Sequence, residues 1–272
     1  RGGGGVSALL EAYQAQFKMT FAVQMQYRAS LVIWLVGMIL EPTVYLVVWS
    51  TVARAQGGAV GGFDPRDFAA YFITVMLVNH WTFTWLMHEF EYSVRMGQLS
   101  PLLLRPLHPM HMHVADNIVY KGLTSLVMVP AAFVLAWAFD ARFELQPWAL
   151  ALAVPALALS FVARLLLGSA LAFAAFWTTR VLAINEMYFL ASWFLSGMMA
   201  PLALLPPVVQ AVAAALPFRW FVSFPAELIL GRLSIDQALQ GLLMQAIWAV
   251  AIYGVFTFLW RQGVKQYSAV GA

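Results

Sequence analysis

Cysteine is absent from this 272-residue chain, and charged residues are scarce. Without cysteine the chain has no disulfides, thiolate metal sites or cysteine nucleophiles. Cysteine usage therefore does not indicate the redox compartment of the protein. Asp, Glu, Lys and Arg make up only 10% of the residues, against about 25% in a typical soluble protein. So little charge, with 62% apolar residues and a mean hydropathy of +0.79, excludes a soluble domain.

Motifs for nucleotide binding and hydrolytic chemistry are also missing. No lysine follows the glycines of a phosphate-binding loop, because Lys18, Lys121 and Lys265 follow Phe, Tyr and Val. Neither H-E-x-x-H nor G-x-S-x-G occurs. We therefore expect a chain that does not hydrolyse ATP and carries no cofactor of its own. A net charge of +3 with this composition does not indicate nucleic acid binding.

Long apolar runs dominate what is present. A membrane-spanning helix needs about 20 mostly apolar residues, and six runs meet this length. They cover about 29–52, 67–88, 116–139, 148–177, 181–205 and 239–260. The predicted fold is an all-α integral membrane protein with a single six-helix domain over 29–267. We interpret residues 1–7 as a truncated or engineered start, and we expect any soluble energy source on another chain.

Residues 8–28 predict an amphipathic helix at the membrane surface. Leu10, Tyr13, Phe17 and Phe21 recur at steps of three and four, with Lys18 among the polar residues of the other side. Between the last two runs, 206–232 is apolar, but prolines divide it into pieces too short to span. Interfacial or re-entrant segments are typical of such lengths.

Six spans place both termini on one side. That side carries eight cationic residues (Arg1, Lys18, Arg28, Arg95, Arg105, Arg180, Arg261, Lys265), and the other carries five (Arg54, Arg66, Arg142, Arg219, Arg232). Cytoplasmic loops are enriched in Lys and Arg. The bias predicts cytoplasmic termini in a multi-pass membrane protein.

The polar loop after the second run contains the segment Gly97-Gln98-Leu99-Ser100-Pro101-Leu102-Leu103-Leu104-Arg105-Pro106. Gly97 would end a helix over 89–96 and let the chain turn sharply. Ser100 as N-cap, Pro101 at the first helical position and Pro106 as a stop predict a short isolated helix over 101–105. Its consecutive leucines indicate either a turn on the membrane surface or a docking site for a cytosolic subunit.

Two further sets of polar residues are candidates. His108, His111 and His113 alternate with methionines, a pattern that suits copper, but headgroup contact is the commoner role and we expect no metal site. Glu41, Lys121, Arg164 and Glu186 lie within or at the edges of spans, where ionisable groups are costly. They form either structural ion pairs and surface contacts or the lining of a substrate path. Glu41 is the leading candidate because Pro42 would interrupt its helix and free a carbonyl.

Together these features resemble the membrane subunit of an ABC-2-type exporter, in particular the six-span permeases of unassigned substrate. The resemblance covers about 8–267 as an order of elements. The sequence similarity is closest at 97–106, which is similar to a coupling helix, and at 176–179, 196–202 and 216–231. Arg180 departs from the pattern, and we assign it no role.

The resemblance implies an obligate complex. Two membrane subunits, identical or related, would pair with two cytosolic ATPases that carry ATP and magnesium. Closure of the ATPases would push on 97–106 and on the helix over 8–28, switching a path for a drug, a lipid or another amphipathic substrate. Two alternatives remain: a stand-alone channel or secondary carrier and, less favoured, an intramembrane lipid-modifying enzyme. Identification of a bound ATPase would distinguish the exporter from both.

Overall fold

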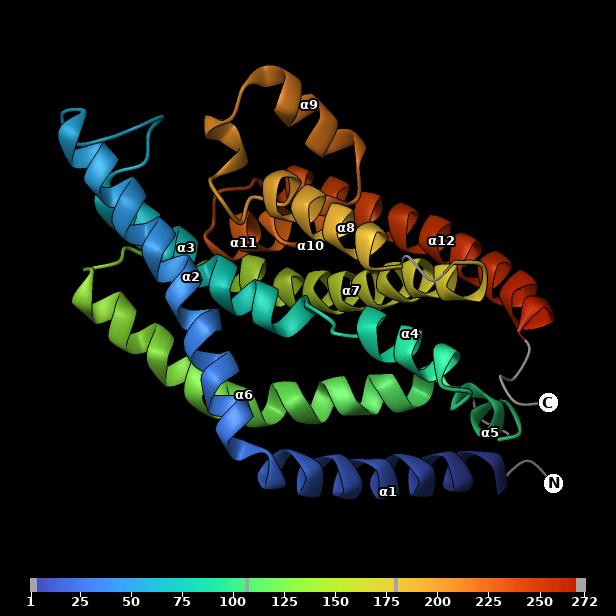
Figure 1. Cartoon of the computed structure of the whole chain (residues 1–272). Helices are drawn as coiled ribbons and strands as arrows, with labels where there is room; N and C mark the ends of the chain where they lie inside the picture. Colours follow the sequence, from blue (N-terminus) through green and yellow to red (C-terminus); the bar gives the residue numbers. More distant parts are fainter. Residues whose placement is uncertain (1–3, 106–107, 179–180, 268–272) are drawn as a thin grey trace.

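A computed structural model describes residues 4–105, 108–178 and 181–267, and in these ranges the regular structure is helical, with no strand. Figure 1 shows the arrangement of the helices. In chain order the elements are α1 (Gly4–Gln26), α2 (Arg28–Ala55), α3 (Pro65–Thr82), α4 (Met87–Arg95), α5 (Leu99–Leu103), α6 (Met110–Ala138), α7 (Pro147–Ala172), η1 (Phe173–Phe176), α8 (Val181–Leu195), η2 (Leu202–Leu204), α9 (Pro207–Ala215), α10 (Phe218–Phe221), α11 (Ser223–Ile229) and α12 (Ile235–Gln266).

Four stretches of the described chain are long and apolar enough to cross a membrane: Ala29–Ala55, Met110–Ala138, Pro147–Phe176 and Ile235–Gln266. They coincide with four of the six predicted spans. The other two predicted spans contain shorter helices, because α3 ends at Thr82 and α8 has only 15 residues. For 67–88 and 181–205, crossing of the membrane stays a prediction.

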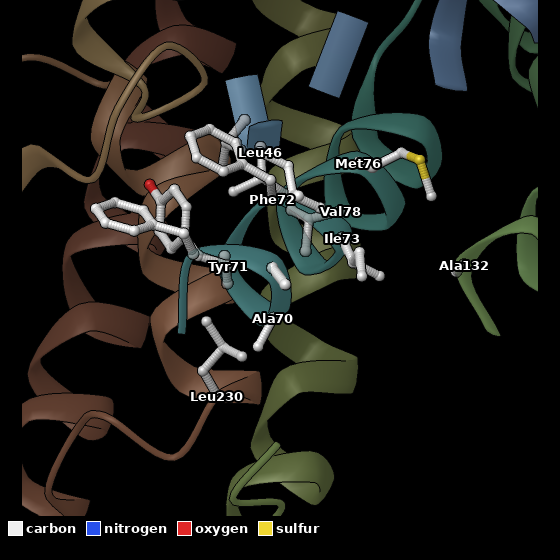
Figure 2. Close-up of a cluster of buried hydrophobic side chains, with 14 of the residues drawn as sticks. Leu46, Ala70, Tyr71, Phe72, Ile73, Met76, Val78, Ala132 and Leu230 are labelled. Atoms are coloured by element: carbon white, nitrogen blue, oxygen red, sulfur yellow. The ribbon is translucent and has the colours of Figure 1, made fainter. Parts of the chain in front are cut away.

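The centre of the fold is α3. Asp64 caps this helix by accepting hydrogen bonds from the backbone N–H groups of Arg66 (2.8 Å) and Asp67 (2.9 Å), and Pro65 occupies the first helical position. Most of the helix is buried, and it packs against α2, α6, α7 and α11. Figure 2 shows the resulting core, where Tyr71, Phe72 and Ile73 of α3 lie among side chains of other helices.

The predicted interruption at Glu41-Pro42 is wrong, since α2 is continuous from Arg28 to Ala55 with Pro42 inside it. Proline removes one backbone donor, but membrane helices tolerate it where nearby hydroxyls and neighbouring helices restore the hydrogen bonding. The Thr43 hydroxyl donates to the adjacent Ile39 carbonyl at 2.7 Å, whereas the carbonyl that Pro42 leaves without its backbone donor is that of Met38.

The proline-rich stretch 206–232 forms three short helices, α9, α10 and α11. Every residue from Phe221 to Ala226 is buried, and α11 packs on both α3 and α7. α9 in the same stretch is mostly exposed, so the choice between an interfacial and a re-entrant placement of 206–232 stays a prediction.

The turn that follows α8 is held against the central helix. Tyr71 donates a hydrogen bond to the Gly197 carbonyl at 2.8 Å. Gly197 has a φ of +86°, and a Cβ at this position would lie 2.6 Å from the Tyr71 hydroxyl oxygen. Only glycine fits both the backbone conformation and the space.

The two ends of the described chain meet at one end of the molecule. The start of α1, the end of α12, α4 and α5 lie together there in Figure 1, while the 56–62 loop and the turn between α6 and α7 lie at the opposite end. α1 runs beside α6, and α12 runs beside α7. The polar segment 97–105 is therefore on the same side as both chain ends.

Candidate functional site

The segment 97–105 forms a sharp turn followed by one helical turn. Gly97 has a φ of +70°, the left-handed conformation that the change of direction between α4 and α5 requires. α5 begins at Leu99, two residues before the predicted start, and Ser100 is not its cap. The Ser100 hydroxyl instead hydrogen-bonds the Tyr267 hydroxyl at 3.1 Å, which ties α5 to the residue after α12. Pro106 lies outside the described residues.

The leucines of this segment differ in exposure. Leu99 is only 1% exposed, and Leu102 and Leu103 are partly buried against the same apolar cluster. Leu104 is 89% exposed. Among the three consecutive leucines, Leu104 is thus the one most available to an external partner, and the predicted docking role of the segment stays a prediction. The outward edge of the segment consists of Pro101, Leu104 and Arg105, which are all exposed.

Aromatic side chains of α4, η1 and α12 form a cluster next to α5. Phe90 of α4 lies 5.1 Å from the Phe173 ring, and Phe173 lies 5.1 Å from Trp260 of α12. Phe176 packs so closely on α12 that a Cβ at Gly263 would lie 2.1 Å from its ring. These contacts join the α4–α5 turn to the ends of α7 and α12. We call α4, α5, η1 and the end of α12 the platform.

The sequence reasoning missed this support, although part of it had a signal. The aromatic pair at 176–177 was noted only as a likeness to a family, and Trp260 only as the end of a span. Trp177 is exposed, and Thr178 ends the described stretch. Thr179 and Arg180 lie outside the described residues. A run of aromatics at the ends of two long helices was the available clue to a packed helix-end cluster.

The three candidate histidines contact three different partners. His108 packs on Trp260 at 4.5 Å, His111 hydrogen-bonds Tyr13 at 2.9 Å, and His113 lies 3.7 Å from a Glu89 carboxylate oxygen. Burial, and then the neighbouring His111, lower the pKa of His108, so that this ring is neutral against Trp260 at pH 7. Among the residues that the structure describes, no group of three or more His, Cys, Asp or Glu could hold a metal ion.

α1 is attached to α6 through polar contacts. Gln16 donates to an Asp116 carboxylate oxygen at 2.9 Å, and Thr20, which is 6% exposed, donates to the same oxygen. The predicted apolar face is therefore only partly correct. Tyr13 and Phe17 are partly buried, but Phe21 is 49% exposed. Lys18 is exposed, as expected for the polar side.

Arg164 lies buried in α7, with 2% of its surface exposed. Its Nη1 donates to Asn79 Oδ1 and to Thr82 Oγ1, both at 2.9 Å, and its guanidinium lies 5.3 Å from the Phe83 ring centre. These partners all belong to the last turn of α3 or to the residue after it. A cation at this carbonyl end is favoured by the helix dipole.

Lys121 reaches the same place from α6. Its ammonium donates to the Phe83 carbonyl and, at 3.3 Å, to Asn117 Oδ1. α3 stops here because Phe83 is extended, with ψ at 141°, and residues 83–86 are not helical. Two cations thus converge on one helix end and are held by neutral oxygens. Within the described residues, none of the four candidate charges has an ion-pair partner at 4.0 Å or less, so the ion pairs that were one of the alternatives are not present there.

The two candidate carboxylates are exposed and lie apart from the cations. Glu186 is on the outer surface of α8, between the exposed side chains of Leu182 and Leu190. Glu41 lines a small cavity between α2 and α3, to which Asn79 also contributes. Asn79 therefore belongs both to the cavity of Glu41 and to the hydrogen-bonding shell of Arg164. Its signal was a polar residue inside an apolar run, which the sequence reasoning did not use.

Helical composition, four helices of spanning length and buried cations held by neutral groups define a multi-pass membrane protein. The chain belongs to a known family: the family model for the ABC-2 family transporter protein matches residues 39–271. A search of curated proteins found no match. The predicted family is confirmed, and the chain is the permease component of an ABC transporter, a part of the transport machinery that is not itself catalytic.

Proposed function

We propose that this chain is the membrane subunit of an ATP-driven exporter. It forms a substrate path together with a second permease, identical or related, and is driven by two cytosolic ATPases that hold ATP and magnesium. It resides in the bacterial inner membrane with both termini in the cytoplasm. The substrate is an amphipathic molecule such as a drug or a lipid.

The main support for this proposal is the structure of the platform. α5 presents Pro101, Leu104 and Arg105 outward while Leu99 anchors it among aromatic side chains. A short helix held this way moves with its support rather than bending, because a close-packed interior transmits strain. Force applied to Leu104 would thus reach the ends of α7 and α12, two helices of spanning length.

α1 offers a second route for the same movement. Its hydrogen bonds to Asp116 connect it to the beginning of α6. A subunit that contacts both α5 and α1 would therefore act on three long helices at one end of the molecule. We propose that this contact switches the path between the two permeases.

The substitution Leu104→Asp tests the docking role. Because Leu104 packs on little of its own chain, the variant should fold and insert normally but no longer co-purify with the ATPase or support export. Leu145→Asp is the matched control, since Leu145 is 53% exposed in the loop before α7. If the ATPase still co-purifies and export continues with both Leu103→Asp and Leu104→Asp, the docking assignment is wrong.

A further inference from the structure

The cavity beside Glu41 has a composition that the proposed function does not use. It lies between α2 and α3, with a volume of about 60 Å³. α2 lines it with Met38, Glu41, Pro42 and Tyr45, α3 with Val75, Met76 and Asn79, and the turn after α8 with Met198. A single carboxylate thus faces a ring and three thioethers.

Neither lysine nor arginine lines this cavity. Arg164 is linked to it through Asn79, but the guanidinium donates to Asn79 and Thr82, and no ion pair with Glu41 forms among the described residues. A carboxylate in an apolar setting is costly unless a cation or hydrogen-bond donors compensate it. The cavity therefore offers its negative charge to a group that comes from outside the chain.

The surroundings favour an organic cation over a metal ion. A metal site needs several oxygen or nitrogen ligands, and Glu41 is the only carboxylate in the lining. Aromatic rings attract ammonium groups through their π faces, and methionines adapt to ligands of varied shape. Tyr45 supplies the ring here, and the Trp193 ring of α8 lies 6.0 Å from it.

The size of the cavity limits what it can hold. Drug-sized ligands fill about 300–1,000 Å³, so a cavity of about 60 Å³ accepts a head group and not a whole molecule. The apolar remainder of the ligand has a surface to lie on, because Leu40, Val44 and Val48 of α2 are 49–58% exposed. An amphipath with one charged end matches this division.

We propose that Glu41 and Tyr45 form the head-group site for an amphipathic organic cation, which the proposed exporter carries. This inference rests on the proposed function, since it names the substrate class of that path. The Glu41 carboxylate neutralises the cation, Tyr45 contacts it through its ring, and Met38, Met76 and Met198 adapt to its shape.

Binding of two single-chain amphipaths with small head groups of opposite charge tests the proposal. Dodecylammonium and dodecanesulfonate are measured against the full chain in lipid nanodiscs, with empty nanodiscs subtracted and with unlabelled ion as competitor. We expect saturable binding of the ammonium amphipath only. Glu41→Gln should weaken it at least about tenfold, the factor that about 1.4 kcal/mol represents, and Tyr45→Leu should weaken it several-fold.

Glu144→Gln is the control, because Glu144 is an exposed carboxylate in the loop before α7 and undergoes the same loss of charge. Glu41→Lys should reverse the preference in favour of dodecanesulfonate. Equal dodecylammonium affinities in the native chain and in Glu41→Gln, or no preference for the cation in the native chain, would overturn the site. If Glu41→Gln does not fold, the charge preference of the native chain and the response of Tyr45→Leu still decide the matter.

Failure of this site and failure of the proposed function give different results. Loss of selectivity for dodecylammonium with an intact effect of Leu104→Asp on ATPase docking removes the head-group site and leaves the exporter. Charge-selective binding that depends on Glu41, in a chain that no ATPase accompanies, removes the ATP-driven mechanism and leaves the site.

Discussion

The platform and the end of α3, where Arg164 and Lys121 converge, both bury side chains almost completely. The interactions that hold the buried side chains differ between the two regions. In the platform, apolar side chains surround Leu99 until almost none of it is exposed, and the one strongly exposed leucine is Leu104. At the end of α3, Arg164 is equally buried, yet its neighbours are neutral oxygens. The first region is held by burial and the second by hydrogen bonds.

The difference indicates which of the two regions can move without losing its contacts. Apolar packing is non-directional and survives a small displacement, so the platform suits the transmission of movement. A buried guanidinium bound by two oxygens at 2.9 Å depends on its geometry. The end of α3 therefore suits a fixed point around which the platform moves.

The largest expected effect is at Arg164. Arg164→Ala should lower the free energy of unfolding by about 4 kcal/mol, because it removes two charge-assisted hydrogen bonds and leaves a cavity. Arg164→Met should cost about half as much, since a long apolar side chain fills the space. Denaturant titration in mixed micelles measures both. A methionine variant as stable as the native chain would show that Arg164 is not needed for the fold.

The leucines of α5 should differ next. Leu99→Ala should cost about 3 kcal/mol because the side chain is fully buried. Leu104→Ala should cost less than about 0.5 kcal/mol, the usual range for an exposed position. Both are measured by the same titration. Equal losses of stability at Leu99 and Leu104 would contradict the division of the platform into a buried anchor and an exposed edge.

The attachment of α1 should show the smallest effect. Asp116→Ala removes the acceptor for Gln16 and Thr20 and should cost about 1.5 kcal/mol. Because these bonds join α1 to α6, hydrogen exchange should rise in α1 and stay unchanged in α7. A uniform rise through the whole chain would mean that α1 is not a separable unit.

The sequence predicted what depends on runs of similar residues. Apolar runs predicted four helices that the structure contains at spanning length, and Gly97 predicted the turn before α5. The exposure of individual residues could not be predicted in the same way. Leu99 and Leu104 are identical in type, and the first is buried because it packs in a cluster that includes residues distant in the sequence, such as Phe173 and Phe256.

The hydrogen-bond partners of the polar residues could not be predicted from local patterns either, because they lie far away in the sequence. Arg164 bonds residues 82 and 85 positions away, and Asp116 bonds residues 96 and 100 positions away. Pro42 predicted a break because proline removes a donor, but α2 continues through it from Arg28 to Ala55. Ser100 was predicted as a cap, whereas its hydroxyl pairs with Tyr267 at the far end of the sequence.

The central claim is that the exposed edge of α5 is covered by a cytosolic ATPase, and the absence of cysteine allows a direct measurement. A single cysteine is introduced at Leu104 and, in a second variant, at Leu145, and each is labelled with a membrane-impermeant maleimide from either side. We expect Leu104→Cys to be labelled only from the cytoplasmic side and to be protected when the ATPase is bound, while Leu145→Cys is labelled only from the opposite side. Labelling of Leu104→Cys that is unchanged by the bound ATPase would show that the ATPase does not cover α5.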